Sequence, residues 1–312
     1  NIVYADSTQG WLPVSDDAVA DAPEAPTTYK AIFGFGGALS GVTNLVNSSG
    51  VVASDVSAVG TARRSPAATG YGLDKAIFAY GVDASGETNI SNLVNNSGVV
   101  ASDVTGVGTA RAYAAGTGYG TDKAIFAYGE TNLNMSNLVT NVGVVGTDVT
   151  GVGTARGRLS AARYGVGLAI YAYGSTSSMV SMSNLVNSSG VIASDVSGVG
   201  TARDSLGAAS YSTDKAIFAY GGDGSSAVSL KNLVSNSGVI AADVTGVGTA
   251  RTYLAAAKYG GDKAIFGFGT NASATHVNTR NLVSNSGVVA SDASGAGTAR
   301  QQLKAATFGA SA

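Results

Sequence analysis

The chain contains no cysteine, one histidine, one tryptophan and four prolines in 312 residues. Without cysteine, disulfide bonds and thiolate-ligated metals are excluded. Zinc sites use several His or Cys ligands, and a Ser–His–Asp triad needs a supported histidine, so the lone His276 favours neither. The Asp/Asn/Gly spacing of calcium-binding loops is also absent. We therefore expect no metal ion and no cofactor.

Charge and long apolar runs are scarce as well. Charged residues make up 12% of the chain, against about 25% in an average domain, and the net charge is −2. A nucleic-acid groove needs a basic stripe, whereas the basic residues here are dispersed, so we expect no nucleic-acid partner. No window of about 20 apolar residues exists, which predicts no membrane span. Residues 1–28 lack a basic start followed by an apolar core, so we expect no signal peptide there.

The chain does contain a repeat with a period of 45 to 49 residues, which is typical of repeat architectures. The tetrapeptide Gly-Thr-Ala-Arg occurs six times, and a Lys-Ala-Ile-Phe-like segment begins fifteen residues after each of the first five copies. A further such segment begins at Lys30 with no tetrapeptide before it. The tetrapeptides occupy residues 60–63, 108–111, 153–156, 200–203, 248–251 and 297–300.

Each repeat is predicted to form four short strands, which we call A to D. Strand A is a run of small residues ending in an aromatic residue and Gly (114–120), and strand B is Lys-Ala-Ile-Phe-Ala-Tyr-Gly (75–81 or 123–129). Strand C is Asn-Leu-Val (92–94), and an Asn/Ser/Gly turn leads to strand D (99–111). Alternation predicts Phe78 and Tyr80 on one face of strand B and Ile77 on the other, so the strand should lie between neighbouring sheets.

The spacings show where the repeats vary. Asn-Leu-Val always precedes Gly-Thr-Ala-Arg by 16 positions, and the tetrapeptide precedes the next strand B by 15. All length variation falls between strands B and C, whose starts are 14 to 18 residues apart. Because loops that tolerate length changes lie on the surface, we expect the B–C loops to be exposed.

Four-stranded units of this length are typical of a β-propeller. The first repeat lacks strand A, and an unpaired strand A remains at residues 303–309. Pairing it with the strand at Lys30 gives six complete sheets and covers edges that an open solenoid would expose. We therefore predict an all-β fold, in which residues 29–312 form a six-bladed β-propeller of four-stranded blades closed by the C-terminal strand.

Residues 1–28 form a separate arm. They hold three of the four prolines and Trp11. Residues 1–4 and 10–14 are predicted short strands, and residues 21–26 an extended linker. Two interpretations remain open: a tail packed on the propeller, or a docking and oligomerisation arm. The second implies other proteins as partners and a homo-oligomer or larger assembly.

The order Arg, small apolar run, Tyr-Gly, Ile-Phe-aromatic-Gly and Asn-Leu-Val resembles the kelch propeller repeat, as in residues 251–269. The near-identical Gly/Ser/Asn-rich copies are also similar to propeller modules of tailed-bacteriophage virions and tail fibres. The kelch resemblance departs at strand D, where tryptophan is absent. These resemblances imply partner binding at the B–C loop face, other virion or surface proteins as partners of residues 1–28, and a virion or extracellular location. They favour a non-enzymatic structural or adhesive module for host attachment.

Two sets of residues are candidates for function. A repeated Asp eight residues before a repeated Arg is interpreted as structural, with a ring that binds a polyanion or a cation as the alternative. The repeated residues are Asp55, Arg63, Asp103, Arg111, Asp148, Arg156, Asp195, Arg203, Asp243, Arg251, Asp292 and Arg300.

The second set lies in the B–C loops, where polar side chains suit glycan recognition but also suit plain solvation. The B–C loop candidates are Asp83, Glu87, Asn89, Glu130, Asn132, Asn134, Ser175, Ser178, Asp223, Ser225, Asn271 and His276. A lectin-like propeller or a spacing scaffold is the alternative function. A polysaccharide-acting enzyme ranks third, because no catalytic constellation is visible in the sequence.

Overall fold

The structure is a computed structural model that describes residues 2–6, 10–13, 29–57, 59–130 and 133–309. Every regular element in these ranges is a β-strand, which confirms the predicted all-β class. Within the same ranges there is no helix long and apolar enough to cross a membrane.

Six three-stranded antiparallel sheets make up the body of the described chain, each with strand B in the middle. Strands A are β5 (Ala67–Tyr71), β10 (Ala115–Tyr119), β13 (Ser160–Tyr164), β16 (Gly207–Tyr211), β20 (Ala255–Tyr259) and β24 (Lys304–Phe308). Strands B are β3 (Lys30–Gly34), β6 (Lys75–Ala79), β11 (Lys123–Gly129), β14 (Leu168–Ala172), β17 (Lys215–Ala219) and β21 (Lys263–Gly267). Strands C are β4 (Thr43–Val46), β9 (Ser91–Val94), β12 (Leu133–Val139), β15 (Ser183–Val186), β18 (Lys231–Val234) and β23 (Arg280–Val283).

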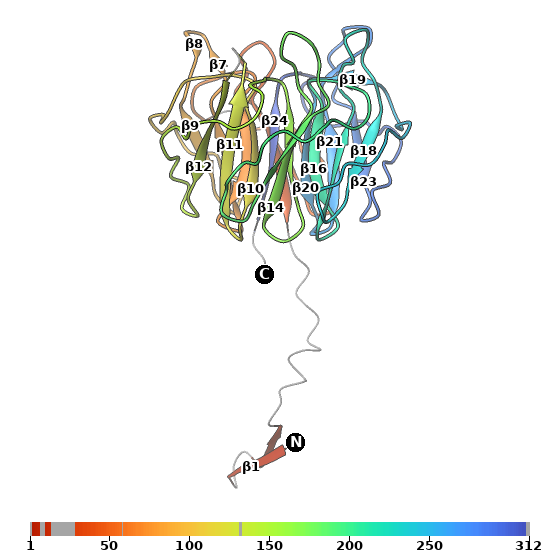
Figure 1. Ribbon diagram of the computed structural model, residues 1–312. Coiled ribbons are helices and arrows are strands. Elements are labelled where there is room, and N and C mark those ends of the chain that lie inside the picture. The colour runs from red at the N-terminus through yellow and green to blue at the C-terminus, as the bar shows by residue number, and fades with distance from the viewer. Residues whose placement is uncertain (1, 7–9, 14–28, 58, 131–132, 310–312) are drawn as a thin grey trace.

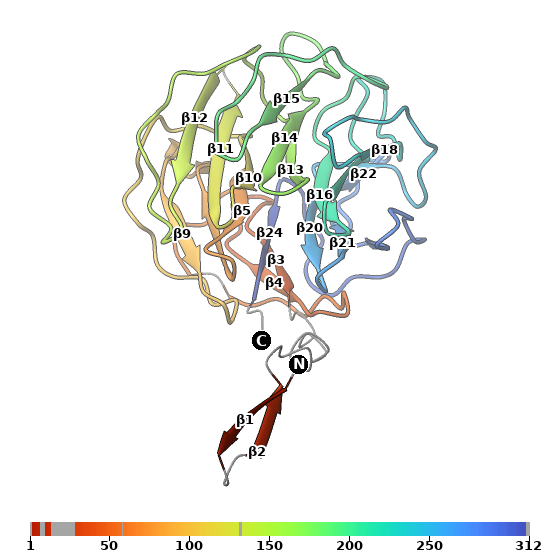
Figure 2. The same cartoon turned by 60° about the horizontal axis from the view of Figure 1, so that its bottom comes forward.

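The sheets stand around a common axis, with their A strands innermost (Figure 2). Each A strand contacts the next, in the order β5, β10, β13, β16, β20 and β24, and β24 contacts β5 in turn. The pairing expected between the C-terminal segment and the first strand B is present, with β24 antiparallel to β3 from Phe308↔Lys30 to Lys304↔Gly34. This arrangement is β-propeller-like.

Strand D is not a regular strand, in contrast to the prediction. Only two isolated bridges join it to strand C in each repeat, as in Ser91↔Val104 and Val94↔Val100. The reason is the buried Asn92, whose side-chain amide enters between the two segments and donates to Ala101 O (3.0 Å) and Asp103 Oδ1 (2.8 Å). The side chain thus occupies a backbone acceptor, Ala101 O, that a continuous ladder could use.

The core consists of apolar clusters between neighbouring sheets. Ile77 and Phe78 are both fully buried, as expected of a strand covered on two sides. The predicted alternation is wrong at Tyr80, which packs in the cluster of Ile77 and Phe126 instead of that of Phe78. Tyr80 has φ 62°, so the extended conformation ends at Ala79 and the ring turns to the other face.

The N-terminal segment contributes one hairpin. β1 (Ile2–Asp6) pairs antiparallel with β2 (Gly10–Pro13), which confirms the two predicted short strands. The expected linker at residues 21–26 lies outside the described residues.

Candidate functional site

One face of the molecule carries the B–C loops together with the connections from strand D to strand A. The two segments pair at Arg64↔Val82 and Asp204↔Gly222, and β19 (Arg251–Thr252) pairs with β22 (Thr270–Asn271). The hairpin of β7 (Val82–Asp83) and β8 (Gly86–Glu87) projects there, at the top of Figure 1. We call this surface the loop face.

The repeated arginines lie below the loop face as buried structural groups. The Arg111 guanidinium stacks 4.0 Å from the ring centre of Tyr80, and Nη1 and Nη2 donate to Thr109 O (3.1 Å) and Asn137 Oδ1 (2.7 Å). Stacking and fork-like donation are what arginine supplies and lysine does not. Equivalent stacked pairs are Arg63–Phe35, Arg156–Tyr128, Arg203–Tyr173, Arg251–Tyr220 and Arg300–Phe268. Burial lowers the pKa of Arg63 to about 10, so it stays charged at neutral pH.

Each repeated aspartate joins its repeat to the one before it. The Asp103 carboxylate accepts from the Thr61 N–H and hydroxyl (3.0 and 2.7 Å) and from the Asn92 amide. Burial alone would raise the pKa of Asp103, but these hydrogen bonds outweigh it and hold the pKa below its ordinary value. The same contacts join Asp148, Asp195, Asp243, Asp292 and Asp55 to Thr109, Thr154, Thr201, Thr249 and Thr298.

The ion pairs also cross between repeats. Arg111 Nη1 is 4.0 Å from Asp148 of the following repeat, so the ion pair joins two repeats. Because the arginine is 0% exposed and donates internally, this set presents no open guanidinium ring to a polyanion.

A ring of backbone hydrogen bonds surrounds the axis just beneath the loop face. It is built by the residue two positions after each repeated arginine, at the entry to strand A. The N–H of each donates to the carbonyl of the preceding one at 2.8–3.2 Å, and every φ lies between 52° and 56°. We call these residues the axial ring: Ser65, Tyr113, Arg158, Ser205, Tyr253 and Gln302.

The axial ring carries a polar cluster that breaks the sixfold repetition. Arg158 pairs with Glu130 (2.5 Å) and Asp204 (3.8 Å) and lies 5.0 Å from the ring centre of Tyr113. The rings of Tyr113 and Tyr253 are 6.3 Å apart, and Gln302 donates to the Tyr113 hydroxyl. We call this group the axial cluster: Tyr113, Glu130, Arg158, Asp204, Tyr253 and Gln302.

The pKa values of three residues of the axial cluster are shifted. Burial raises the pKa of Asp204, although Ser205 and Arg158 act in the opposite direction. Burial also raises the pKa of Tyr253 more than Arg158 lowers it. For Arg158, burial would lower the pKa, but the nearby Tyr253 and Glu130 outweigh it and raise it. Desolvated charges at the centre of a face are common at binding sites.

Sequence reasoning found only Glu130 of this cluster. The signal lay in the second position after each Gly-Thr-Ala-Arg, which holds Ser, Tyr, Arg or Gln within an otherwise constant spacing. The axial ring explains why that position matters, because it brings six residues far apart in the sequence to one point.

Several predicted B–C loop residues make hydrogen bonds that stabilise the loops. The side chains of Asn89 and Asn134 donate to Gly108 O (2.7 Å) and Gly153 O (2.9 Å). Asp83, Asp223 and Asn271 accept backbone N–H groups within their own turns. Hydrogen bonds from Ser226 and Ser225 hold the pKa of Asp223 below its ordinary value. Ser175 bridges Gly157 and Met179 through its backbone.

The remaining candidates are open to solvent. Glu87, Ser178, Ser225 and His276 are exposed on four different loops. Asn132 lies outside the described residues. Among the residues that the structure describes, there is no group of three or more His, Cys, Asp or Glu side chains that could hold a metal ion.

No family model and no curated protein matches the chain. The solved structure described as "Structure of YjhT" is similar to it, with a TM-score of 0.61 over 86% of this chain and 98% of that chain. The two sequences are 11% identical, so the likeness concerns the fold alone.

Proposed function

We propose that the chain is a six-bladed β-propeller, closed where β24 pairs with β3, and that it acts as a non-catalytic adhesive or structural module. Six three-stranded sheets, the cyclic order of the A strands and the likeness to a solved structure support the architecture. The irregular D segment completes each blade as an outermost fourth strand.

The observation that carries the proposed function is that the constant residues and the variable residues of each repeat have different roles. The Arg, Asp, Thr and Asn side chains that recur in every repeat are used in contacts within or between repeats. Many of the residues that differ between repeats lie in the B–C loops and the axial cluster, which share the loop face. A scaffold that keeps its interfaces constant while one face varies is suited to recognition on that face.

The chemistry of the loop face fits a polar, hydroxyl-rich ligand. Exposed Glu87, Ser178, Ser225 and His276 surround a centre in which Tyr113 and Tyr253 offer ring surface. Tyrosine combines apolar area with a hydrogen-bonding hydroxyl, so it suits sugar rings as well as protein surfaces. We propose a surface glycan as the ligand and a virion appendage, such as a tail fibre, as the setting.

A panel of purified bacterial lipopolysaccharides and capsular polysaccharides tests this. We expect the full chain to bind at least one panel member, and the combined variant Glu87→Lys, Ser178→Glu, Ser225→Lys and His276→Asp to lose that binding. The matched control combines Thr213→Glu in an A–B turn with Lys215→Glu at the start of β17, and both positions are exposed. Equal binding by both variants would contradict the proposal.

The axial cluster also favours a second candidate, a polysaccharide-acting enzyme. Asp204 has a raised pKa beside Arg158 and Tyr253, an arrangement that can serve acid–base chemistry. This candidate predicts shortened oligosaccharides when the chain is incubated with a bound polysaccharide, and their loss in Asp204→Asn. Binding without product release favours the adhesive module.

A further inference from the structure

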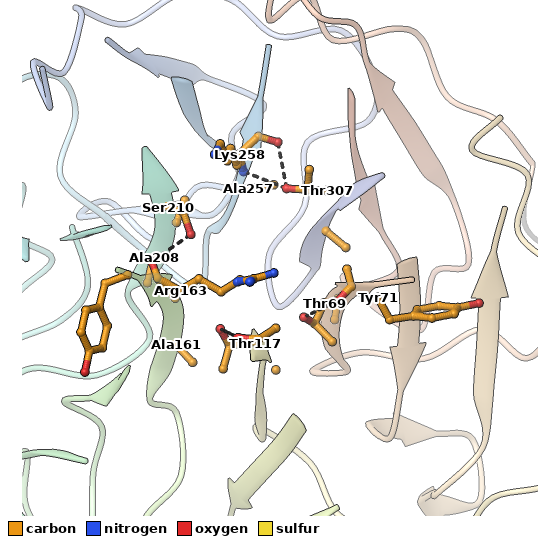
Figure 3. A pocket seen from close by; sticks show the side chains of 18 of the residues that line it. Thr69, Tyr71, Thr117, Ala161, Arg163, Ala208, Ser210, Ala257, Lys258 and Thr307 are labelled. Atoms are coloured by element: carbon orange, nitrogen blue, oxygen red, sulfur yellow. Dashed lines mark hydrogen bonds between the residues drawn. The ribbon is translucent and has the colours of Figure 1, made fainter. Parts of the chain in front are cut away.

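The channel enclosed by the A strands contains a cavity of about 450 Å³ that no part of the proposed function uses. Its wall comes from all six A strands and its mouth from A–B turns, so it opens on the face opposite the loop face. Figure 3 shows Arg163 reaching across it from β13, with Thr69, Thr117, Lys258 and Thr307 around it. We call it the axial well.

The well has room because its wall residues are small. Mostly Ala, Gly, Ser and Thr line it. The charged side chains that β13 and β20 contribute come from the position before the final aromatic residue of strand A. At that position β5 and β10 have Gly70 and Gly118, whereas β13 and β20 have Arg163 and Lys258. A Cβ on Gly118 would lie 2.9 Å from Arg163 Cδ, so the glycine makes space for the arginine.

Hydrogen bonds hold the cation-bearing strands in place. Arg163 Nη2 donates to Gly120 O (2.6 Å), and Ser210 Oγ donates to Arg163 O (3.0 Å). Thr307 Oγ1 accepts from Lys258 N (3.1 Å) and donates to Lys258 O (2.9 Å). The backbones of both cationic residues are therefore fixed by the neighbouring strand.

A third cation lies deeper. Lys304 begins β24, three residues before Thr307, which places it about 10 Å further from the mouth. It lines a smaller inner cavity that shares Ala68 and Ala305 with the axial well. Burial lowers its pKa to about 8, so it is mostly charged at neutral pH.

The two ammonium groups lack partners. Within the described ranges, no hydrogen bond or ion pair joins the Nζ atom of Lys258 or Lys304 to the protein. Burial and the nearby Arg163 lower the pKa of Lys258, whereas the Asp262 carboxylate acts in the opposite direction. The carboxylate among the lining residues, Asp122, sits at the mouth, where it accepts from Asn141 at 2.8 Å. Partly desolvated charges that no carboxylate contacts are costly, and a bound anion would lower that cost.

We propose that the axial well binds a small oxyanion with two or more negative charges, held by Arg163 and Lys258 and attracted by Lys304 in the inner cavity behind them. The guanidinium suits a carboxylate or phosphate group, and the two ammonium groups act as point charges at two depths. The ligand must be small, because it has to fit a cavity of about 450 Å³ that is entered from the A–B turns. The axial ring surrounds the channel at the other end.

Isothermal titration of the full chain with inorganic phosphate, citrate, acetate and glucose tests the site. At least one of phosphate and citrate should bind, one ion per chain and at least about tenfold more tightly than acetate, and glucose should give no heat of binding. Binding of phosphate alone or citrate alone identifies the preferred group. Lys258→Met and Lys304→Met should each weaken binding about tenfold or more.

The matched control is Lys215→Met, which removes the same charge from an exposed position outside the well. It should leave affinity unchanged. Thermal melts guard against misfolding: without ligand, Lys304→Met should melt no lower than the unmodified chain, because it removes a lone buried charge. The proposal is overturned if neither phosphate nor citrate binds at millimolar concentration, or if Lys258→Met and Lys215→Met bind alike.

Discussion

Thr298 donates its hydroxyl to Asp55 at 2.6 Å, although 243 residues separate the two in the sequence. The same contact joins Thr61 to Asp103 between repeats that follow one another along the chain. The junction of the first and last repeats is therefore built like the others, and Arg300 completes it by donating to Asn44 Oδ1 at 2.7 Å.

Breaking this junction should cost stability without changing the fold. We expect Asp55→Ala to lower the free energy of unfolding by about 1–3 kcal/mol, because it leaves the Thr298 N–H and hydroxyl without their acceptor. A double-mutant cycle with Thr298→Val, followed by urea unfolding, should give a coupling of about 0.5–3 kcal/mol. Asp103→Ala is the matched control at a junction without chain ends. Strictly additive effects at positions 55 and 298 would contradict the contact.

Removing β24 should have a larger effect. Deletion of residues 303–312 removes buried Leu303 and Phe308 and exposes the edge of β3. Two large buried side chains are worth about 6 kcal/mol, so Tm should fall by at least about 10 °C. Deletion of residues 310–312 alone serves as the control. If the longer deletion melts with the full chain, β24 does not stabilise the fold.

Acid should destabilise the protein through the repeated aspartates. Their pKa values are lowered in the folded state, because hydrogen bonds from Thr and Asn outweigh the opposing effect of burial. Stability from such groups is present above the unfolded pKa and is lost as pH falls through the folded pKa. Urea unfolding should therefore give a constant free energy between about pH 5 and 7 and a fall below about pH 4. A flat profile down to pH 3 would show that the carboxylates contribute little.

The arm should govern assembly. We expect the full chain to be multimeric and a version starting at Thr28 to be monomeric, measured as native mass by light scattering. The apolar Trp11 and Leu12 in a short hairpin are typical anchors of an interface. Two monomers would make the arm a tail without an assembly role. A variant with Trp11→Ala and Leu12→Ala in the full chain separates the loss of these anchors from the loss of the arm.

Much of the architecture could be predicted because the repeat is regular. Constant spacing located strands A, B and C, and the phase of the repeat predicted that residues 303–309 would pair with the strand at Lys30. The features that were missed depend on individual side chains. Asn92 interrupts the ladder to strand D, and Tyr80 leaves the strand alternation through a left-handed φ.

The candidate sites were harder to predict because they form across repeats. Glu130 lies in a B–C loop, and Arg158 and Asp204 follow the repeated arginines of two different repeats. Their proximity therefore depends on the axial ring. Lys258 and Lys304 stand at ordinary strand positions, and only the closeness of the A strands around one axis places both in a channel. Constant spacing identifies the residues that recur in every repeat, whereas the candidate sites depend on residues that differ between repeats.

The contact between each repeated aspartate and the threonine of the preceding repeat makes the repeats exchangeable. Every unit offers the same acceptor to one neighbour and the same donor to the other, whatever its B–C loop contains. Recombination between copies could therefore exchange or reorder B–C loops without any compensating change at the contacts between repeats. The near-identity of the copies, which looks redundant for folding, provides the homology for such exchange and lets one face diversify quickly on a constant frame.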